Sequence, residues 1–200
     1  MRVLVACEFS GVVRDAFTAL GHDAMSCDIL PSLSPGEHYQ GDVLDLIDEP
    51  YDLVIAHPPC TYLALSGVRW LYSEPGRQEK MEEAAEFFNK MSKFNSPRIA
   101  IENPVQHRYA VEAHGLGKQT QVVNPWQFGH PERKMTCLWL YNLPKLVETD
   151  NVKEQMLALP KNQQNRIHFA PDSKGRELKR SITYSGIAAA MAEQWGGLDS

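Results

Sequence analysis

Short apolar runs alternate with amphipathic, helix-forming stretches through the first half of the chain. Such runs, bounded by turn residues, are typical of buried strands. The predicted strands are Arg2–Cys7, Ala24–Cys27, Asp52–Ala56 and Arg98–Ile101. The predicted helices are Val12–Leu20, Leu44–Ile47 and Gln78–Phe94, the last rich in Glu, Ala and Lys. This alternation predicts an α/β fold, with a mostly parallel central sheet flanked by helices.

The second half of the chain has a less regular pattern. Two further strands are predicted at Thr120–Val123 and Met135–Leu140, and a final helix at Ser185–Trp195. Between them, residues 142–181 show weak periodicity and contain three prolines, so we expect a loop-rich insertion with one short helix near Val152–Leu159. The pattern contains no internal repeat and no clear linker. We therefore expect residues 1–200 to form one domain.

Composition and charge narrow the class of protein. Neither a signal peptide nor an apolar stretch long enough to span a bilayer is recognisable, so we expect a cytoplasmic protein without a membrane partner. The net charge of −5 argues against binding nucleic acid over the whole surface, although a local basic face is compatible with it. The cysteines, Cys7, Cys27, Cys60 and Cys137, are too scattered for a disulfide framework or a zinc site, and we expect no metal.

The segment His57-Pro58-Pro59-Cys60 directly follows the predicted strand Asp52–Ala56. The two prolines cannot continue a central strand, so the chain must turn there. Cys60 is thereby presented at the carboxyl end of the strand, where open α/β sheets place their ligands. A thiol in that position is a candidate nucleophile, and His57 is a candidate for tuning it. The alternative is a buried, inert cysteine, which is the commonest kind.

Acidic residues also follow predicted strand ends in the first half: Glu8, Asp28 and Asp42. In a doubly wound sheet, a carboxylate after the second strand is placed to bind ribose hydroxyls, and one after the next strand can lie near an adenine amine. Asp28 and Asp42 suit these two roles. For any one of these acids taken alone, a helix cap or a turn residue is the better explanation, but three in register before the cysteine turn favour a binding role.

The loop Phe9-Ser10-Gly11 joins the first strand to the first helix, and a helix amino terminus beside a glycine is a usual cofactor contact. One glycine is too few for a dinucleotide-binding fingerprint. A cofactor without a pyrophosphate, such as S-adenosylmethionine, needs less of a glycine-rich cradle.

In their order along the chain, these motifs resemble those of the C5-cytosine DNA methyltransferases, in a compact form. The matching segments are Phe9-Ser10-Gly11, Asp28, Gly41-Asp42-Val43, Pro58-Pro59-Cys60, Glu102-Asn103-Pro104, Phe128–Lys134 and Ser185–Ala188. The resemblance implies a Rossmann-like, S-adenosylmethionine-dependent methyltransferase that acts on cytosine in DNA. Such a compact form would suit restriction-modification or a phage or mobile element.

The resemblance also implies roles for particular residues. Cys60 would add to carbon 6 of cytosine, Glu102 would hold or protonate ring nitrogen 3, and Arg133 or Lys134 would lie near the pyrimidine carbonyl. A base in a duplex would have to be flipped out of the helix. The implied cofactor-binding residues are Phe9, Ser10, Gly11, Asp28, Ile29, Asp42, Val43 and Pro58.

The chain departs from the family pattern in several places. Val12, Val13 and Arg14 stand where the family has more glycines, and residues 142–181 are too few for a target-recognition domain, which a partner subunit would then supply. The insertion carries a basic cluster that either meets DNA phosphates or is a solvated loop. The cluster comprises Lys174, Arg176, Lys179 and Arg180.

Other functions remain open on the sequence. His57–Cys60 also resembles the Asp/Asn-Pro-Pro-Tyr loop of amino-methyltransferases, which need no thiol. RNA or a free nucleotide is an alternative substrate. A catalytically inactive nucleic-acid-binding relative is the third possibility, although such a protein has no chemical reason to retain both Cys60 and Glu102.

Overall fold

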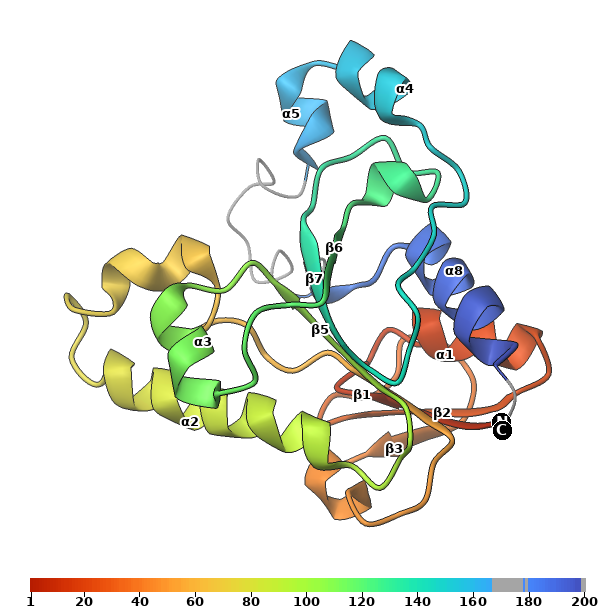
Figure 1. Cartoon of the computed structure of the whole chain (residues 1–200), viewed down its shortest axis with the longest axis horizontal. Helices are drawn as coiled ribbons and strands as arrows, with labels where there is room; N and C mark the ends of the chain where they lie inside the picture. The colour runs from red at the N-terminus through yellow and green to blue at the C-terminus, as the bar shows by residue number, and fades with distance from the viewer. Residues whose placement is uncertain (167–177, 179, 199–200) are drawn as a thin grey trace.

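A computed structural model describes residues 1–166, 178 and 180–198 (Figure 1). Its centre is a seven-stranded sheet with the order β3-β2-β1-β4-β5-β7-β6. The strands are β1 (Arg2–Ala6), β2 (Asp23–Asp28), β3 (His38–Gln40), β4 (Leu53–Ala56), β5 (Ile99–Pro104), β6 (Gln121–Val123) and β7 (Thr136–Tyr141). Strands β1 to β5 are parallel, and β7 runs antiparallel to both of its neighbours.

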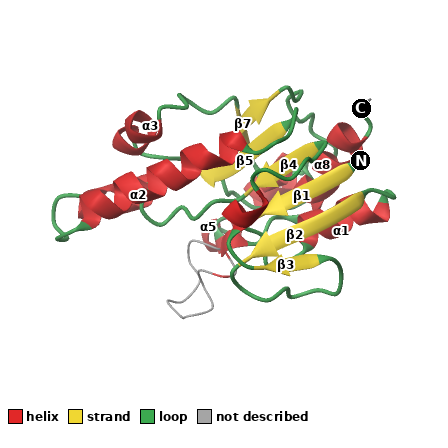
Figure 2. Cartoon of the chain, turned by 90° about the horizontal axis from the view of Figure 1, so that it is seen from below, coloured by secondary structure: helices red, strands yellow, loops and turns green. Residues whose placement is uncertain are grey.

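Helices cover both faces of this sheet. The helices α1 (Val12–Ala19) and α8 (Ser185–Gly196) lie side by side on one face, where Phe17 and Trp195 are fully buried (Figure 1). The helices α2 (Arg77–Lys90) and α3 (Arg108–His114) pack on the other face around Phe88. Strands β1 and β4 lie side by side in Figure 2. Both are buried on both faces, β1 from Val3 onward, and these buried parts are therefore continuously apolar.

The predicted strands and long helices are all present, with small shifts at their ends. The structure adds β3 and α3, for which the sequence pattern gave no prediction. The remaining short elements are η1 (Val43–Leu46), η2 (Leu65–Trp70), η3 (Met91–Lys93), η4 (Pro125–Gln127), α4 (Lys153–Ala158) and α5 (Lys161–Gln164). The short helix expected near Val152–Leu159 is α4.

Strand β5 is longer than predicted. It continues through Glu102 and Asn103 to Pro104, because Asn103 pairs with Cys137 and Pro104 with Thr136 on the antiparallel strand β7. Glu102 therefore lies inside a strand, with its side chain fixed by the sheet.

The strand order reverses between β1 and β4, so the chain has the doubly wound, Rossmann-like α/β architecture that the sequence predicts. In such sheets, ligands bind beyond the carboxyl ends of the strands at this switch point. The segments that leave β1 and β4 begin at Cys7 and His57, and both carry predicted site residues. Within the part of the chain that the structure describes, no helix is long and apolar enough to cross a bilayer.

Candidate active site at the switch point

Cys60 lies on a tight turn just beyond β4. The turn begins at His57, whose backbone N–H donates to the carbonyl of Ala6 at 2.9 Å, so it is joined to β1. The carbonyl of Cys60 accepts from the backbone N–H groups of Leu63 and Ala64, at 3.0 and 2.9 Å. These bonds hold the half-buried Cys60 beyond the sheet edge, as the prolines predict.

The Cys60 turn is fastened to the segment that follows β5. Buried Asn103 donates from Nδ2 to the carbonyl of Pro58 at 2.8 Å. Backbone bonds join His107 to Leu63 at 3.1 Å and Leu65 to Val105 at 2.8 Å. The turn therefore has a fixed position relative to β5.

A chain of side chains continues from Asn103 into α3. Gln106 donates to Asn103 Oδ1 at 3.2 Å, and His114 Nε2 lies 2.9 Å from Gln106 Oε1. The Leu116 N–H donates to His114 Nδ1, so the imidazole proton is on Nε2, which donates a hydrogen bond to Gln106 Oε1. Burial lowers the pKa of His114, which keeps this imidazole neutral at physiological pH. The sequence contained no signal for this chain of contacts.

Glu102 pairs with His57. His57 Nδ1 lies 2.8 Å from Glu102 Oε2, and the two side chains are only 7% and 13% exposed. Burial alone would raise the pKa of Glu102, but the hydrogen bond and charge of His57, with the charge of Lys134, hold it below its ordinary value. Glu102 is therefore a carboxylate at neutral pH. His57 contacts this carboxylate, whereas the sequence suggested that it would tune Cys60.

The pKa of the Cys60 thiol depends on its burial and on the charges of Glu102, Lys134 and Arg180. Burial raises the pKa of the Cys60 thiol and Glu102 raises it further, whereas Arg180 and Lys134 act in the opposite direction. Cys60 is thus a protonated thiol at rest, close to two cations. The Nζ of Lys134 donates to the Arg180 carbonyl at 2.7 Å.

Of the two predicted base-holding residues, Lys134 lines the same small cavity as Glu102. Arg133 is turned toward α4, where its Nε lies 3.2 Å from Met156 Sδ. The cavity has room for about one water molecule, with a volume of about 10 Å³. Its lining is Glu102, Lys134, Thr136, Thr183, Tyr184 and Ile187.

A larger cavity of about 320 Å³ lies between α2 and α3, beside Tyr72 and Tyr109. Its described lining includes none of the predicted site residues. We place the candidate active site at the switch point because Cys60, the candidate nucleophile, and its charged neighbours lie there.

The predicted cofactor residues gather beyond β1, β2 and β3. Cys7, which the sequence did not single out, lies between them with a left-handed φ of 58°. Burial raises the pKa of the Cys7 thiol, as do the charges of Asp28 and Asp42. Asp28 accepts the Leu30 N–H at 2.9 Å, so one oxygen of this carboxylate already closes a turn.

Asp42 caps η1, since its Oδ1 accepts the Leu44 N–H at 2.9 Å. The exposure of the remaining cofactor candidates differs widely. Ile29 is 75% exposed, whereas Val43 and Pro58 are buried.

The amino terminus of α1 is occupied by Glu8. The carboxylate of this buried residue accepts the N–H groups of Val13 and Arg14 at 2.7 and 3.2 Å, and the Ser10 hydroxyl at 3.1 Å. Phe9 and Ser10 are buried, and Gly11 has a left-handed φ of 75°. The Val13 and Arg14 amides, which the helix start would otherwise offer to a cofactor, are therefore engaged by the protein itself.

The structure thus places most of the predicted residues in two groups at one edge of the sheet. Cys60, Glu102 and Lys134 lie on the β4–β5 side, and Phe9, Asp28 and Asp42 on the β1–β2 side. Of the basic cluster in the insertion, Arg180 lies near Cys60, whereas Lys174, Arg176 and Lys179 lie outside the described residues.

No protein-family model matches this chain, and no curated protein matches it either. Among solved structures it is similar to a protein described provisionally as a DNA modification methyltransferase encoded within an E. coli prophage, at 17% identity and a TM-score of 0.44. That match covers 79% of this chain and 55% of the other, so the chain spans little more than half of it. A second similarity, to WbdD bound to a kinase inhibitor, has 11% identity, a TM-score of 0.40 and coverage of 73% and 37%. At TM-scores this low, neither likeness bears on the function of this chain.

Proposed function

We propose that this protein is an S-adenosylmethionine-dependent DNA methyltransferase that acts on carbon 5 of cytosine through a covalent bond to Cys60. The observation that carries the proposal is that Glu102 and Lys134 line one cavity and lie close enough to Cys60 for their charges to affect its thiol. These three groups suit the chemistry of a cytosine ring. The thiol would attack carbon 6, the carboxylate would bind at ring nitrogen 3, and the cation would polarise the carbonyl.

In the proposed reaction, the Cys60 sulfur bonds to carbon 6 of cytosine and negative charge develops at ring nitrogen 3. The thiol must first lose its proton, and the charges of Lys134 and Arg180 favour the thiolate. The bond to carbon 6 makes carbon 5 nucleophilic. Transfer of the methyl group to carbon 5 would leave the cofactor as S-adenosylhomocysteine. Water then takes the carbon 5 proton, the double bond between carbons 5 and 6 re-forms as the Cys60 sulfur leaves as a thiolate, and ring nitrogen 3 returns its proton to Glu102.

Glu102 has two tasks in this scheme. As a carboxylate it accepts a hydrogen bond from the exocyclic amine of the base. To protonate ring nitrogen 3 it must first take up a proton. An imidazolium at His57, whose Nδ1 lies within hydrogen-bonding distance of Glu102 Oε2, would supply that proton and remain as a neutral imidazole. The small cavity beside Glu102 and Lys134 must also open before a pyrimidine ring can enter. Breaking the hydrogen bond from Lys134 to the Arg180 carbonyl is one way to open it.

The adenosine end of the cofactor fits the other group of residues. In this scheme Asp28 accepts hydrogen bonds from the ribose hydroxyls, and the exposed side chain of Ile29 contributes an apolar surface. Asp42, Val43 and Pro58 complete the proposed binding residues. When bound, S-adenosylmethionine supplies the electrophilic methyl group. Phe9, Ser10 and Gly11 shape the loop between this group and α1.

The proposed substrate is cytosine in DNA, flipped out if the DNA is duplex. Arg180 lies beside the site and would meet phosphates, together with Lys174, Arg176 and Lys179 from the same stretch of sequence. A partner subunit would supply further sequence recognition, because residues 142–166 form only α4 and α5 with their connections.

Covalent trapping tests the proposal. The wild type, Cys60→Ser and the control Cys137→Ser are incubated with labelled S-adenosylmethionine and DNA containing 5-fluorocytosine, from which fluorine cannot leave as a cation. Cys137 is a buried thiol on β7 and is not proposed as a nucleophile. We expect an adduct with the wild type and with Cys137→Ser but none with Cys60→Ser.

A Cys60→Ser variant that still transfers methyl groups would exclude the covalent route and favour an amino-methyltransferase. Absence of an adduct with a wild type that binds the cofactor would move the assignment to RNA, to a nucleotide or to a binding protein without activity.

A further inference from the structure

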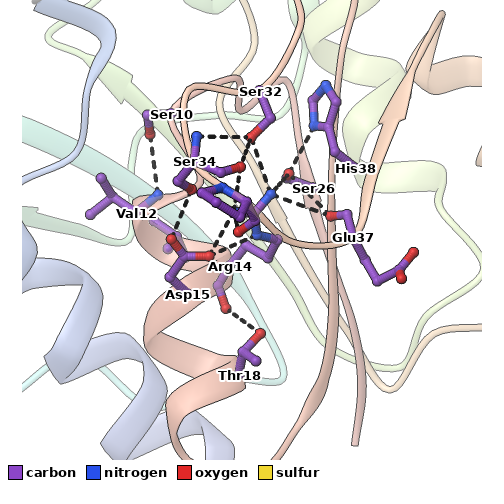
Figure 3. A network of polar contacts seen from close by, with 12 residues as sticks. Ser10, Val12, Arg14, Asp15, Thr18, Ser26, Ser32, Ser34, Glu37 and His38 are labelled. Atoms are coloured by element: carbon purple, nitrogen blue, oxygen red, sulfur yellow. Dashed lines mark hydrogen bonds and ion pairs between the residues drawn. The ribbon is translucent and has the colours of Figure 1, made fainter.

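Arg14 is almost completely buried, at 1% exposure, in the first turn of α1. Every nitrogen of its guanidinium group donates a hydrogen bond, as the close-up in Figure 3 shows. The contacts include the Asp15 carboxylate at 2.7 Å and the Pro35 carbonyl at 2.9 Å. The full set of partners is Asp15, Ser26, Ser32, Ser34, Pro35 and Glu37.

Most of these partners belong to one loop, residues 29–37, which joins β2 to β3. Arg14 therefore fastens this loop to α1 through a set of bonds that a lysine could not reproduce, because only a guanidinium offers five N–H groups in a fixed plane. The Ser34 hydroxyl also donates to the Asp15 carboxylate at 2.8 Å, so the charge partner of Arg14 holds the same loop.

Two glycines make room for the guanidinium group. A Cβ on Gly36 would lie 2.8 Å from Arg14 Cζ, and a Cβ on Gly11 would lie 2.5 Å from Arg14 Nη2. Both glycines also have positive φ, 140° and 75°. The backbone on both sides is thus shaped around this side chain.

Loop 29–37 presents apolar side chains outward although its backbone is tied down. Ile29 is 75% exposed and Leu33 is 67% exposed. The Leu33 N–H donates to the Phe9 carbonyl at 2.8 Å, and the Leu30 carbonyl lies 3.0 Å from His38 Nε2. This loop has a fixed backbone and exposed apolar side chains, and it lies beside Asp28. Such a surface is suited to packing against the flat face of a purine.

We infer that Arg14 is a positioning residue that holds loop 29–37 as a wall for the adenosine part of the cofactor. This inference rests on the proposed function, since it assumes an adenosine ligand beside Asp28. The inference gives a role to Arg14, which stands with Val12 and Val13 where the family pattern has more glycines. One long side chain fixes the neighbouring loop where additional glycines are expected.

The test compares ligand binding by Arg14→Met, Arg14→Lys and the control Arg2→Met. Arg2 also pairs with a carboxylate, Glu49, and donates to a proline carbonyl, Pro50, but at the opposite end of β1. Dissociation constants for S-adenosylhomocysteine and for adenosine are measured by calorimetry, well below the melting temperature of each variant. Hydrogen exchange of the Leu30 and Leu33 amides reports on the loop itself.

We expect Arg14→Met to raise both dissociation constants by the same factor, about tenfold if the binding-competent loop falls to about one tenth of the population. Arg14→Lys should lie between it and the wild type, Arg2→Met should match the wild type, and the Leu30 and Leu33 amides should exchange faster in Arg14→Met. A folded Arg14→Met variant with unchanged dissociation constants would overturn the inference, even if its melting temperature fell. So would an equal rise in Arg2→Met.

A wild type that binds neither ligand would instead refute the cofactor of the proposed function. Should Arg14→Met fail to fold, Ser34→Ala removes one hydroxyl that contacts both Arg14 and Asp15. It should raise both dissociation constants several-fold, and unchanged values would again overturn the inference.

Discussion

His57 Nδ1 lies 2.8 Å from Glu102 Oε2, across the pair of parallel strands β4 and β5. His57 comes directly after β4 and Glu102 lies inside β5, so the sheet register itself brings the two side chains together. The other ring nitrogen of His57, Nε2, is buried and has no hydrogen-bond partner among the described residues. The Nδ1 contact with Glu102 is therefore the interaction through which His57 affects the candidate site.

This pair predicts a characteristic dependence of stability on pH. Because the pKa of Glu102 in the fold is below its ordinary value of 4.5, its contribution to stability is present above that value and disappears as the pH falls through the lower, folded value. Glu102→Gln should cost about 2 kcal/mol at pH 7. The difference from the wild type should shrink on acidification.

Chemical denaturation from neutral to acid pH measures this difference. Glu86→Gln is the control, because Lys90 also lowers the pKa of Glu86, but at the exposed surface of α2. A Glu102→Gln deficit that stays constant down to the acid limit would show that the pair has no electrostatic role.

The reactivity of Cys60 should follow the charges around it. Because burial and Glu102 raise the pKa of its thiol, Cys60 should be alkylated slowly by iodoacetamide at neutral pH. Removing the carboxylate in Glu102→Gln should accelerate the reaction, by up to about tenfold for one pKa unit. Removing a cation in Lys134→Met should slow it.

Peptide mapping by mass spectrometry gives the rate at each cysteine in one sample. Cys27 serves as the internal reference, since burial raises the pKa of its thiol to about 12 and the charges of Asp28 and Asp42 act in the same direction. If Glu102→Gln left the Cys60 rate unchanged, the proposed electrostatic link between these residues would be wrong.

Asn103 should be required to hold the Cys60 turn. Asn103→Ala leaves the buried Pro58 carbonyl without the donor at 2.8 Å, which should cost about 1–3 kcal/mol of unfolding free energy. The same change should slow adduct formation with 5-fluorocytosine DNA, because Cys60 would be less well positioned. Urea denaturation and the trapping rate are the two measurements.

Asn95→Ala is the matched control for Asn103→Ala. Asn95 also donates from Nδ2 to a backbone carbonyl, that of Asp48 at 3.0 Å, but in an exposed position. Its stability should change by no more than about 0.5 kcal/mol and its trapping rate should be normal. Equal losses in both variants would argue against a special role for Asn103.

The start of α8 should tolerate no side chain at Gly186. A Cβ there would lie 1.9 Å from the Phe128 carbonyl oxygen, which belongs to the backbone and cannot move aside easily. Gly186→Ala should therefore destabilise the protein by at least about 1–3 kcal/mol, as overpacking does. Thermal unfolding should show a clear drop for Gly186→Ala.

Gly197→Ala, at the other end of α8, meets its closest atom at an ordinary 3.6 Å and should unfold close to the wild type. A wild-type melting temperature for Gly186→Ala would mean that the start of α8 does not lie so close to the Phe128 carbonyl.

The sequence predicted the central sheet because strands buried on both faces read as unbroken apolar runs, as in Leu53–Ala56. It could not show that β5 continues to Pro104, since that extension depends on pairing with β7, a strand more than thirty residues further along the chain. The edge strand β3 has only three residues in a polar context, too little pattern for a prediction.

The candidate site was predicted in its parts but not in its contacts. Cys60 was identified because it follows a predicted strand and a turn, which are local signals, whereas Glu102 and Lys134 were implied by the family resemblance. The contacts that hold the site join distant segments. His57 contacts Glu102, and Asn103 donates to the Pro58 carbonyl in the Cys60 turn. The sequence singled out Arg14 only as a departure from the family's glycines, and only the fold reveals that it is buried and enclosed by loop 29–37.

The position of Glu8 has a consequence for which small molecules this sheet edge accepts. Its carboxylate lies where phosphate groups usually bind, at the positive end of a helix, and so repels other anions from the α1 amides. Triphosphates and dinucleotides should be rejected here on electrostatic grounds alone. S-adenosylmethionine has no phosphate, and its sulfonium and ammonium cations outweigh its one carboxylate, so it should meet much less repulsion. Discrimination against phosphate-bearing nucleotides would then begin with a single helix-capping side chain.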